Sequence, residues 1–145
     1  MAPVFGVRRP VEPKLLRRVH GRLARTGGCE AVRYEPSRRD ANEVVADVDP
    51  VAFLERSYST TKARLRVEFD LRGDRPHSWI QWWEPESDRG VGWHADDTEP
   101  EHGPVHLQTE YPDGTTERKP AEHVDDEHPY RTFERRLTSI LEELS

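Results

Sequence analysis

Apolar and polar residues alternate through the middle of the chain, the pattern of half-buried β-strands. The clearest alternation covers 63–71, where every second residue is apolar (Ala63, Leu65, Val67, Phe69, Leu71). The same period predicts further strands, one of which places Trp79 and Trp83 opposite Ile80 and Trp82. These strands cover 29–35, 43–48, 77–84, 89–95 and 105–111, and a helical turn is expected from Asp49 to Leu54.

Apolar residues recur with a helical period both before and after this series of predicted strands. Pro13 suits a first helical turn, Gly27-Gly28 supplies a stop, and residues 14–26 between them carry leucine and valine on one face. Pro129 opens a second helix to about Leu144, with an apolar stripe suited to covering a sheet (Tyr130, Phe133, Leu137, Ile140, Leu141, Leu144). We therefore predict an α+β domain over 13–145 after an extended basic arm over 1–12. Its core would be an antiparallel meander of about five or six strands with an N-terminal and a C-terminal helix, and 115–128 would be a loop.

Charge is distributed unevenly along the 145 residues. Residues 1–39 carry ten Lys and Arg against three Asp and Glu, a net of +7, and residues 84–128 carry three against fourteen, a net of −11. A basic segment suits an anionic partner, and we expect RNA to dock on Arg17, Arg18, Arg22 and Arg25. The acidic half has another explanation, a solvated surface adapted to high salt, since lysine is scarce.

The expected cellular compartment follows from features that the sequence lacks. The single cysteine, Cys29, excludes an internal disulfide and a four-cysteine zinc site, and fits a reducing cytoplasm. We interpret it as a small buried hydrophobic residue. No apolar run is long enough for a membrane span, and the first residues lack a signal-peptide core. We expect a soluble, cytoplasmic protein.

Candidate chemistry is concentrated between His77 and Tyr111, which contain all four tryptophans and four of the seven histidines. Metal-free cleavage of RNA needs a base, an acid and a cation on the phosphate. His94 and His106 are the proton-transfer candidates, Asp97 and His102 support them, and Arg89 is the candidate phosphate ligand. The alternative is that these polar residues only cover the solvent side of a half-buried sheet.

Two other interpretations use the same segment. His94, Asp97, His102 and His106 lie within thirteen residues and include the imidazole and carboxylate ligands of zinc, although their spacing matches no established motif. An exposed Trp79, Trp82 or Trp83 would stack on unpaired bases, while at least two tryptophans must fill the core under the terminal helix. A metal-dependent hydrolase and a non-catalytic interaction domain therefore stay open, and no tightly bound cofactor is expected.

Residues 43–145 resemble the TumE-like toxins of type II toxin–antitoxin systems. The resemblance runs from Ala63-Arg64-Leu65-Arg66-Val67-Glu68-Phe69 through the aromatic strand His77-Ser78-Trp79-Ile80-Gln81-Trp82-Trp83. It continues through Gly92-Trp93-His94-Ala95-Asp96-Asp97, a loop with His102 and His106, and the terminal helix. Where family members tend to have arginine before the aspartate, this chain has His94-Ala95, and the family's neighbouring loop histidines are here separated. The resemblance implies a small effector that acts on RNA and is neutralised by a cognate antitoxin protein.

Overall fold

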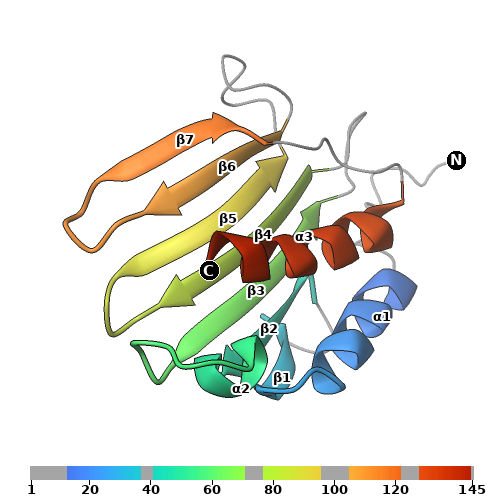
Figure 1. The fold of residues 1–145 in the computed structure, drawn as a ribbon. Coiled ribbons are helices and arrows are strands. Elements are labelled where there is room, and N and C mark those ends of the chain that lie inside the picture. Colours follow the sequence, from blue (N-terminus) through green and yellow to red (C-terminus); the bar gives the residue numbers. More distant parts are fainter. Residues whose placement is uncertain (1–12, 37–40, 71–76, 96–104, 122–127, 145) are drawn as a thin grey trace, which may run out of the picture.

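The strands form a single seven-stranded antiparallel sheet whose order follows the chain, β1 to β7, in the computed structural model (Figure 1). The structure describes residues 13–36, 41–70, 77–95, 105–121 and 128–144. The strands are β1 Cys29–Glu35, β2 Glu43–Val48, β3 Ala63–Asp70, β4 His77–Glu84, β5 Arg89–Ala95, β6 Val105–Glu110 and β7 Thr116–Pro120. The helices are α1 Pro13–Ala24, α2 Pro50–Leu54 and α3 Pro129–Glu143. The predicted α+β meander between two helices is confirmed, with more strands than expected.

The additional strand is β7, in a segment that the sequence pattern assigned to a loop. It pairs antiparallel with β6, from Glu110 opposite Thr116 to His106 opposite Pro120. All five β7 residues are exposed. The strand therefore forms through its backbone pairing at the sheet edge and buries no apolar stripe, which is why hydrophobic periodicity missed it.

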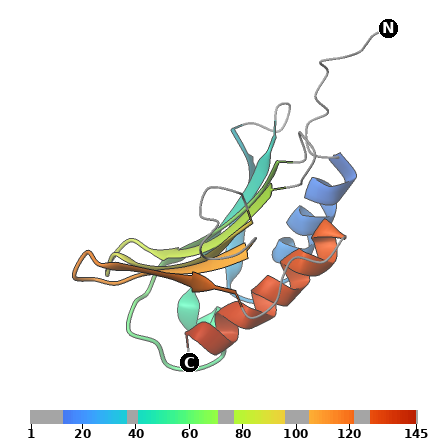
Figure 2. The same ribbon diagram turned by 90° about the horizontal axis from the view of Figure 1, so that it is seen from above.

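One face of the sheet forms the core with the two long helices. The alternate residues of β3 are buried as predicted, and Trp82 and Trp93 are buried beside them. Trp82 has no exposed surface, so the interpretation in which it stacks on bases is wrong. Figure 2 shows α1 and α3 side by side on this face of the curved sheet. Helix α1 packs on β1 and β2, while α3 packs on β4 and β5.

The helices bury the stripes that their periods predicted, with one exception. Leu15, Leu16, Val19 and Leu23 of α1 are buried, as are Phe133, Leu137 and Ile140 of α3 and Leu144 after it. Leu141 is 39% exposed and does not belong to the α3 stripe. No helix in the described ranges is both long and apolar enough to cross a membrane.

The short helix α2 is fixed against the turn that follows α1. The carboxylate of Asp49 caps it by accepting hydrogen bonds from the backbone N–H groups of Val51 and Ala52, at 3.1 and 3.4 Å. Gly28 has a φ of +89°, and a Cβ there would lie 2.5 Å from the backbone nitrogen of Phe53. Gly28 thus ends the α1 turn and also allows α2 to approach the chain closely.

Candidate functional site

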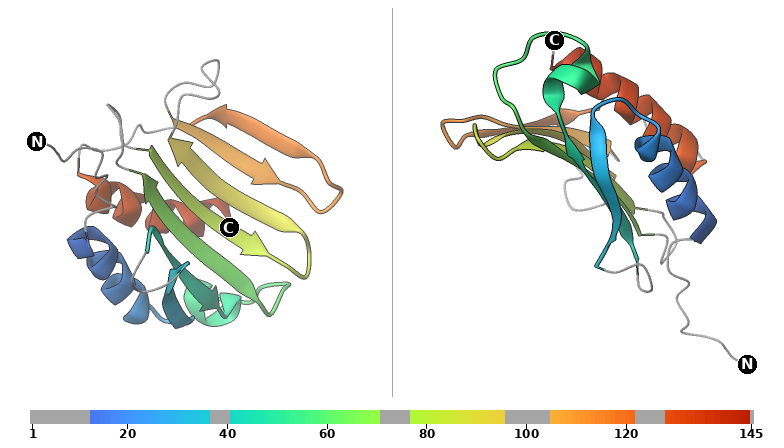
Figure 3. Two further views of the ribbon diagram at one scale, coloured as in Figure 1. Left: turned by 180° about the vertical axis from the view of Figure 1, so that it is seen from behind. Right: turned by 90° about the horizontal axis from the view of Figure 1, so that it is seen from below.

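The opposite face of the sheet carries a groove that no described helix covers; Figure 3 (left) views this face directly. Its volume is about 550 Å³, within the range of small-ligand sites. Side chains from four strands and the residue before β2 line this open-face groove: Asn42, Glu43, Arg64, Arg66, Glu68, Trp79, Gln81, Trp83 and Glu110. The sheet itself thus forms the floor of the candidate site.

Two glycines of β5 allow side chains of β4 to lie flat over the sheet. Gly90 lies opposite Trp83, and Gly92 lies opposite Gln81. A Cβ at Gly90 would be 2.8 Å from Cε3 of Trp83, and one at Gly92 would be 2.8 Å from Oε1 of Gln81. Any larger residue at these two β5 positions would push the β4 side chains into the groove.

Trp79 is held in place from two sides. Its Nε1–H donates to Oε1 of Gln81 at 2.7 Å, and its ring meets the His94 ring edge-on at a centroid distance of 4.4 Å. The residue nevertheless keeps 38% of its surface exposed. Such an anchored but exposed indole is a stacking platform that loses little conformational entropy on binding.

Ion pairs hold both of the arginines that line the groove. Arg66 donates to the nearly buried carboxylate of Glu43, and Nε of Arg64 lies 3.6 Å from Oδ1 of Asp47. Burial raises the pKa of Glu43 above its ordinary value, and the positive charge of Arg66 opposes this shift. With three carboxylates and two guanidinium groups in its lining, the groove is not an electropositive surface.

His94 and His106, the proposed proton-transfer pair, lie directly opposite each other on β5 and β6. Their ring centroids are 5.0 Å apart at an interplanar angle of 64°. They extend the cross-strand row that begins with Glu68 and Trp79 of the groove. His106 is only 1% exposed and His94 is half-buried, so His94 is the member of the pair that a substrate reaches first.

Asp97 and His102 lie outside the described residues, so their support of the histidine pair stays a prediction. The same holds for the zinc interpretation, which requires both of them. Among the residues that the structure describes, no three His, Cys, Asp or Glu side chains gather as metal ligands would.

The structure does not bring Arg89 to the histidines. Arg89 begins β5 and His94 lies five residues later, near its end. An odd separation places the two side chains on opposite faces of the sheet, and the strand rise separates them by about 17 Å. The guanidinium of Arg89 instead donates to the Tyr58 hydroxyl at 2.9 Å. The proposed role of Arg89 as phosphate ligand beside His94 is therefore wrong.

Arg89 belongs to a hydrogen-bond network around Glu84, at the end of β4. The Glu84 carboxylate is 1% exposed and accepts hydrogen bonds from the Tyr58 hydroxyl, the Trp82 indole N–H at 2.8 Å and the Ser87 hydroxyl at 2.9 Å. Burial and the hydrogen bond to Glu84 raise the pKa of Tyr58 to about 12. We interpret this network as structural, because three donors satisfy the buried charge.

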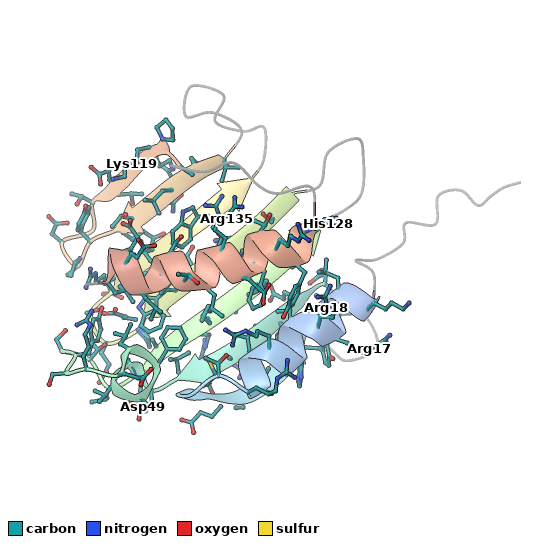
Figure 4. The ribbon with its side chains drawn as sticks, turned by 45° about the vertical axis from the view of Figure 1, so that its right-hand side comes forward. Arg17, Arg18, Asp49, Lys119, His128 and Arg135 are labelled. Atoms are coloured by element: carbon teal, nitrogen blue, oxygen red, sulfur yellow. The ribbon has the colours of Figure 1, made fainter. Side chains whose placement is uncertain are left out.

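A second candidate surface lies on the helical side of the molecule. Five cations follow α1 with no carboxylate among them, a set that we call the cationic stripe (Lys14, Arg17, Arg18, Arg22, Arg25). All are exposed except Arg22, which is half-buried and donates to the Thr26 hydroxyl at 2.6 Å. The guanidinium of Arg18 packs 3.8 Å over the Tyr130 ring, which joins the stripe to α3. Figure 4 shows Arg17 and Arg18 near the start of α3, where His128 lies.

Sequence reasoning did not single out Arg64, Arg66, Glu68 or Gln81 as site residues. The alternation of β3 and β4 did place them on the polar face together with Trp79 and Trp83. What it lacked was the register between strands, which sets Glu68 beside Trp79 and Arg66 beside Gln81. Searches against family models, curated proteins and solved structures find no match for this chain.

Proposed function

We propose that the protein is an RNA-binding, toxin-like effector whose cationic stripe docks on RNA phosphates. The observation that carries the proposal is the charge of α1 and the turn after it, where five cations stand without a carboxylate. From Lys14 to Arg25 the stripe extends about 16 Å, since a helix rises 1.5 Å per residue. A polyanion gains counterion release along such a length, whereas a small anion would contact only one or two of the cations.

The resemblance of residues 43–145 to TumE-like toxins supports RNA as the polyanion and a cognate antitoxin as the partner. The test is fluorescence anisotropy with a labelled single-stranded RNA at several salt concentrations. We expect binding that weakens steeply with salt. Arg17→Gln/Arg25→Gln removes two exposed cations, and should lower the magnitude of the log–log salt slope by about 1.4, at about 0.7 per phosphate contact.

Lys62→Gln/Lys119→Gln is the matched control, because it removes two exposed cations away from the stripe. This variant should retain both affinity and slope. Equal losses in the two variants would mean that only net charge matters, and absence of RNA binding at about 50 mM salt would refute the proposal.

Cleavage of the bound RNA is the second candidate, favoured by the contact between the His94 and His106 rings. In this mechanism the half-buried His94 takes the proton of a 2′-hydroxyl as that oxygen attacks the adjacent phosphorus, and the imidazolium so formed gives the proton to the 5′ oxygen as its bond to phosphorus breaks. His106 positions the His94 ring. Induced expression of the wild type should arrest growth, and purified protein should cut RNA without added metal. Both effects should disappear in His94→Ala/His106→Ala.

His20→Ala is the control for loss of an imidazole, since His20 stacks on Tyr34 and hydrogen-bonds to Val32, remote from the groove lining. Equal toxicity of the wild type and the double variant would exclude the histidine pair. RNA binding through the stripe is measured separately, so it does not depend on this outcome.

A further inference from the structure

The open-face groove has no role in phosphate docking, and its chemistry suits a different part of a nucleotide. Its lining carries three carboxylates and two guanidinium groups, so a phosphate placed there meets net negative charge. An uncharged ligand avoids that repulsion. The groove also offers a flat apolar surface, the exposed Trp79 indole, which favours a planar ring.

The polar groups beside Trp79 determine which hydrogen-bonding groups a ligand ring stacked on Trp79 must carry at its edge. Glu68 lies directly opposite Trp79 on β3, and Arg66 lies two residues before Glu68 on the same face. Directly opposed residues have their Cβ atoms about 5 Å apart, so a ring stacked on Trp79 has its edge within reach of both side chains. The carboxylate accepts hydrogen bonds and the guanidinium donates them, so a matching edge has donors next to acceptors.

Guanine is the nucleobase that satisfies both groups at once. Its N1–H and N2 amino group are adjacent donors for a carboxylate, and its O6 and N7 are acceptors for a guanidinium. Adenine, cytosine and uracil also carry acceptors for a guanidinium, but each offers a carboxylate only one donor group. None of them can form the pair of hydrogen bonds that N1–H and N2 of guanine give to a single carboxylate.

We propose that the open-face groove binds a guanine base, stacked on Trp79, with Glu68 accepting from N1–H and N2 and Arg66 donating to O6. The Arg66–Glu43 ion pair orients the guanidinium, and the Trp79–Gln81 hydrogen bond holds the platform. This inference builds on the proposed function where the base belongs to RNA. A free guanine nucleotide presents the same edge.

Quenching of tryptophan fluorescence by guanosine, adenosine, cytidine and uridine tests the proposal in the full-length protein. Guanosine should bind at least tenfold more tightly than the other three. Glu68→Gln preserves the shape of the side chain but not its charge, and should reduce guanosine affinity tenfold or more. Trp79→Leu should abolish binding measured by calorimetry. Glu117→Gln, on the exposed edge strand β7, is the matched control and should bind as the wild type does.

Equal binding of the four nucleosides by wild-type protein, or no binding, overturns the inference whether or not any variant folds. Two further ligands separate the sources of the base. Tighter binding of a uridine octamer with one central guanine than of an all-uridine octamer assigns the base to RNA, and equal binding of the two octamers assigns it to a free guanine nucleoside or nucleotide.

The cationic stripe and the open-face groove lie on opposite faces of the sheet, so each of the two proposals can be refuted without the other. Arg17→Gln/Arg25→Gln should lose RNA affinity but keep guanosine affinity. Salt-dependent RNA binding without guanosine binding would refute the groove proposal alone, and guanosine binding without RNA binding would refute the stripe proposal alone.

Discussion

Removal of the Tyr58 hydroxyl should destabilise the fold, because it takes one of three donors from a buried charge. Glu84 is 1% exposed, and in Tyr58→Phe its carboxylate keeps only the Trp82 and Ser87 donors. A hydrogen bond to a charged group contributes about 1.5–3 kcal/mol, so we expect the free energy of unfolding to fall by about 2 kcal/mol. For a chain of this size the melting temperature should fall by roughly 4–8 °C. Urea denaturation at pH 8 measures the difference directly.

The matched control is Tyr111→Phe, because its hydroxyl also donates to a carboxylate, that of Glu117 at 3.1 Å, but in an exposed position. This change should cost less than about 0.5 kcal/mol. The pH dependence gives an independent check. The pKa of Tyr58 is raised from 10.0 to about 12, so its contribution is fully present below pH 10 and is lost as the pH rises through about 12. The difference in free energy of unfolding between the wild type and Tyr58→Phe should therefore decrease as the pH rises from 10 to about 12. A Tyr58→Phe protein as stable as Tyr111→Phe would refute the assignment of a buried, satisfied charge.

Two further predictions concern neighbouring residues, Gly28 in the turn after α1 and Cys29 at the start of β1. Gly28→Ala should lower the free energy of unfolding by about 2 kcal/mol or more, because the φ of Gly28 is +89° and a Cβ there would meet the backbone of Phe53. The control is Gly114→Ala, since Gly114 has a φ of +91° but open space around it, and this change should lower the free energy of unfolding by only about 1 kcal/mol. Burial raises the pKa of Cys29 from 9.0 to about 11, so the thiolate fraction at pH 8 is about a hundredfold lower and iodoacetamide should react slowly until urea unfolds the chain. Equal reaction rates with and without urea would contradict the second prediction, and equal costs at the two glycines would contradict the first.

Local patterning predicted most of the fold because each strand from β2 to β6 buries residues on one face, and β1 packs Val32 and Tyr34 partly against the core. In β3 the residues Ala63, Leu65, Val67 and Phe69 are all buried, and their period of two is visible without any knowledge of the partners. Strand β7 has no such period, since its backbone pairs with β6 while its side chains remain in solvent. Its charged residues and terminal proline are those of a protected edge, which sequence reasoning assigned to a loop.

The candidate site was harder to predict because it depends on register as well as on residue type. Arg89 and His94 were grouped because both lie near the ends of predicted strands, yet their odd separation along one strand already placed them on opposite faces. His94 and His106 come together only because β5 and β6 pair at that register, which the pattern of neither strand specifies on its own. Alternation along one strand therefore excludes pairs of residues that lie on opposite faces, but it does not show which residues of different strands lie together in a site.

The groove extends this argument across the whole sheet. One cross-strand row contains a residue from each of five successive strands: Glu43, Glu68, Trp79, His94 and His106. A slip of one residue in any pairing would bring a core residue into this row and turn a residue of the row toward the core. The burial of the opposite face thus fixes the register and thereby the order of carboxylates, indole and imidazoles. The stability of the core and the composition of the site are two consequences of the same pairings.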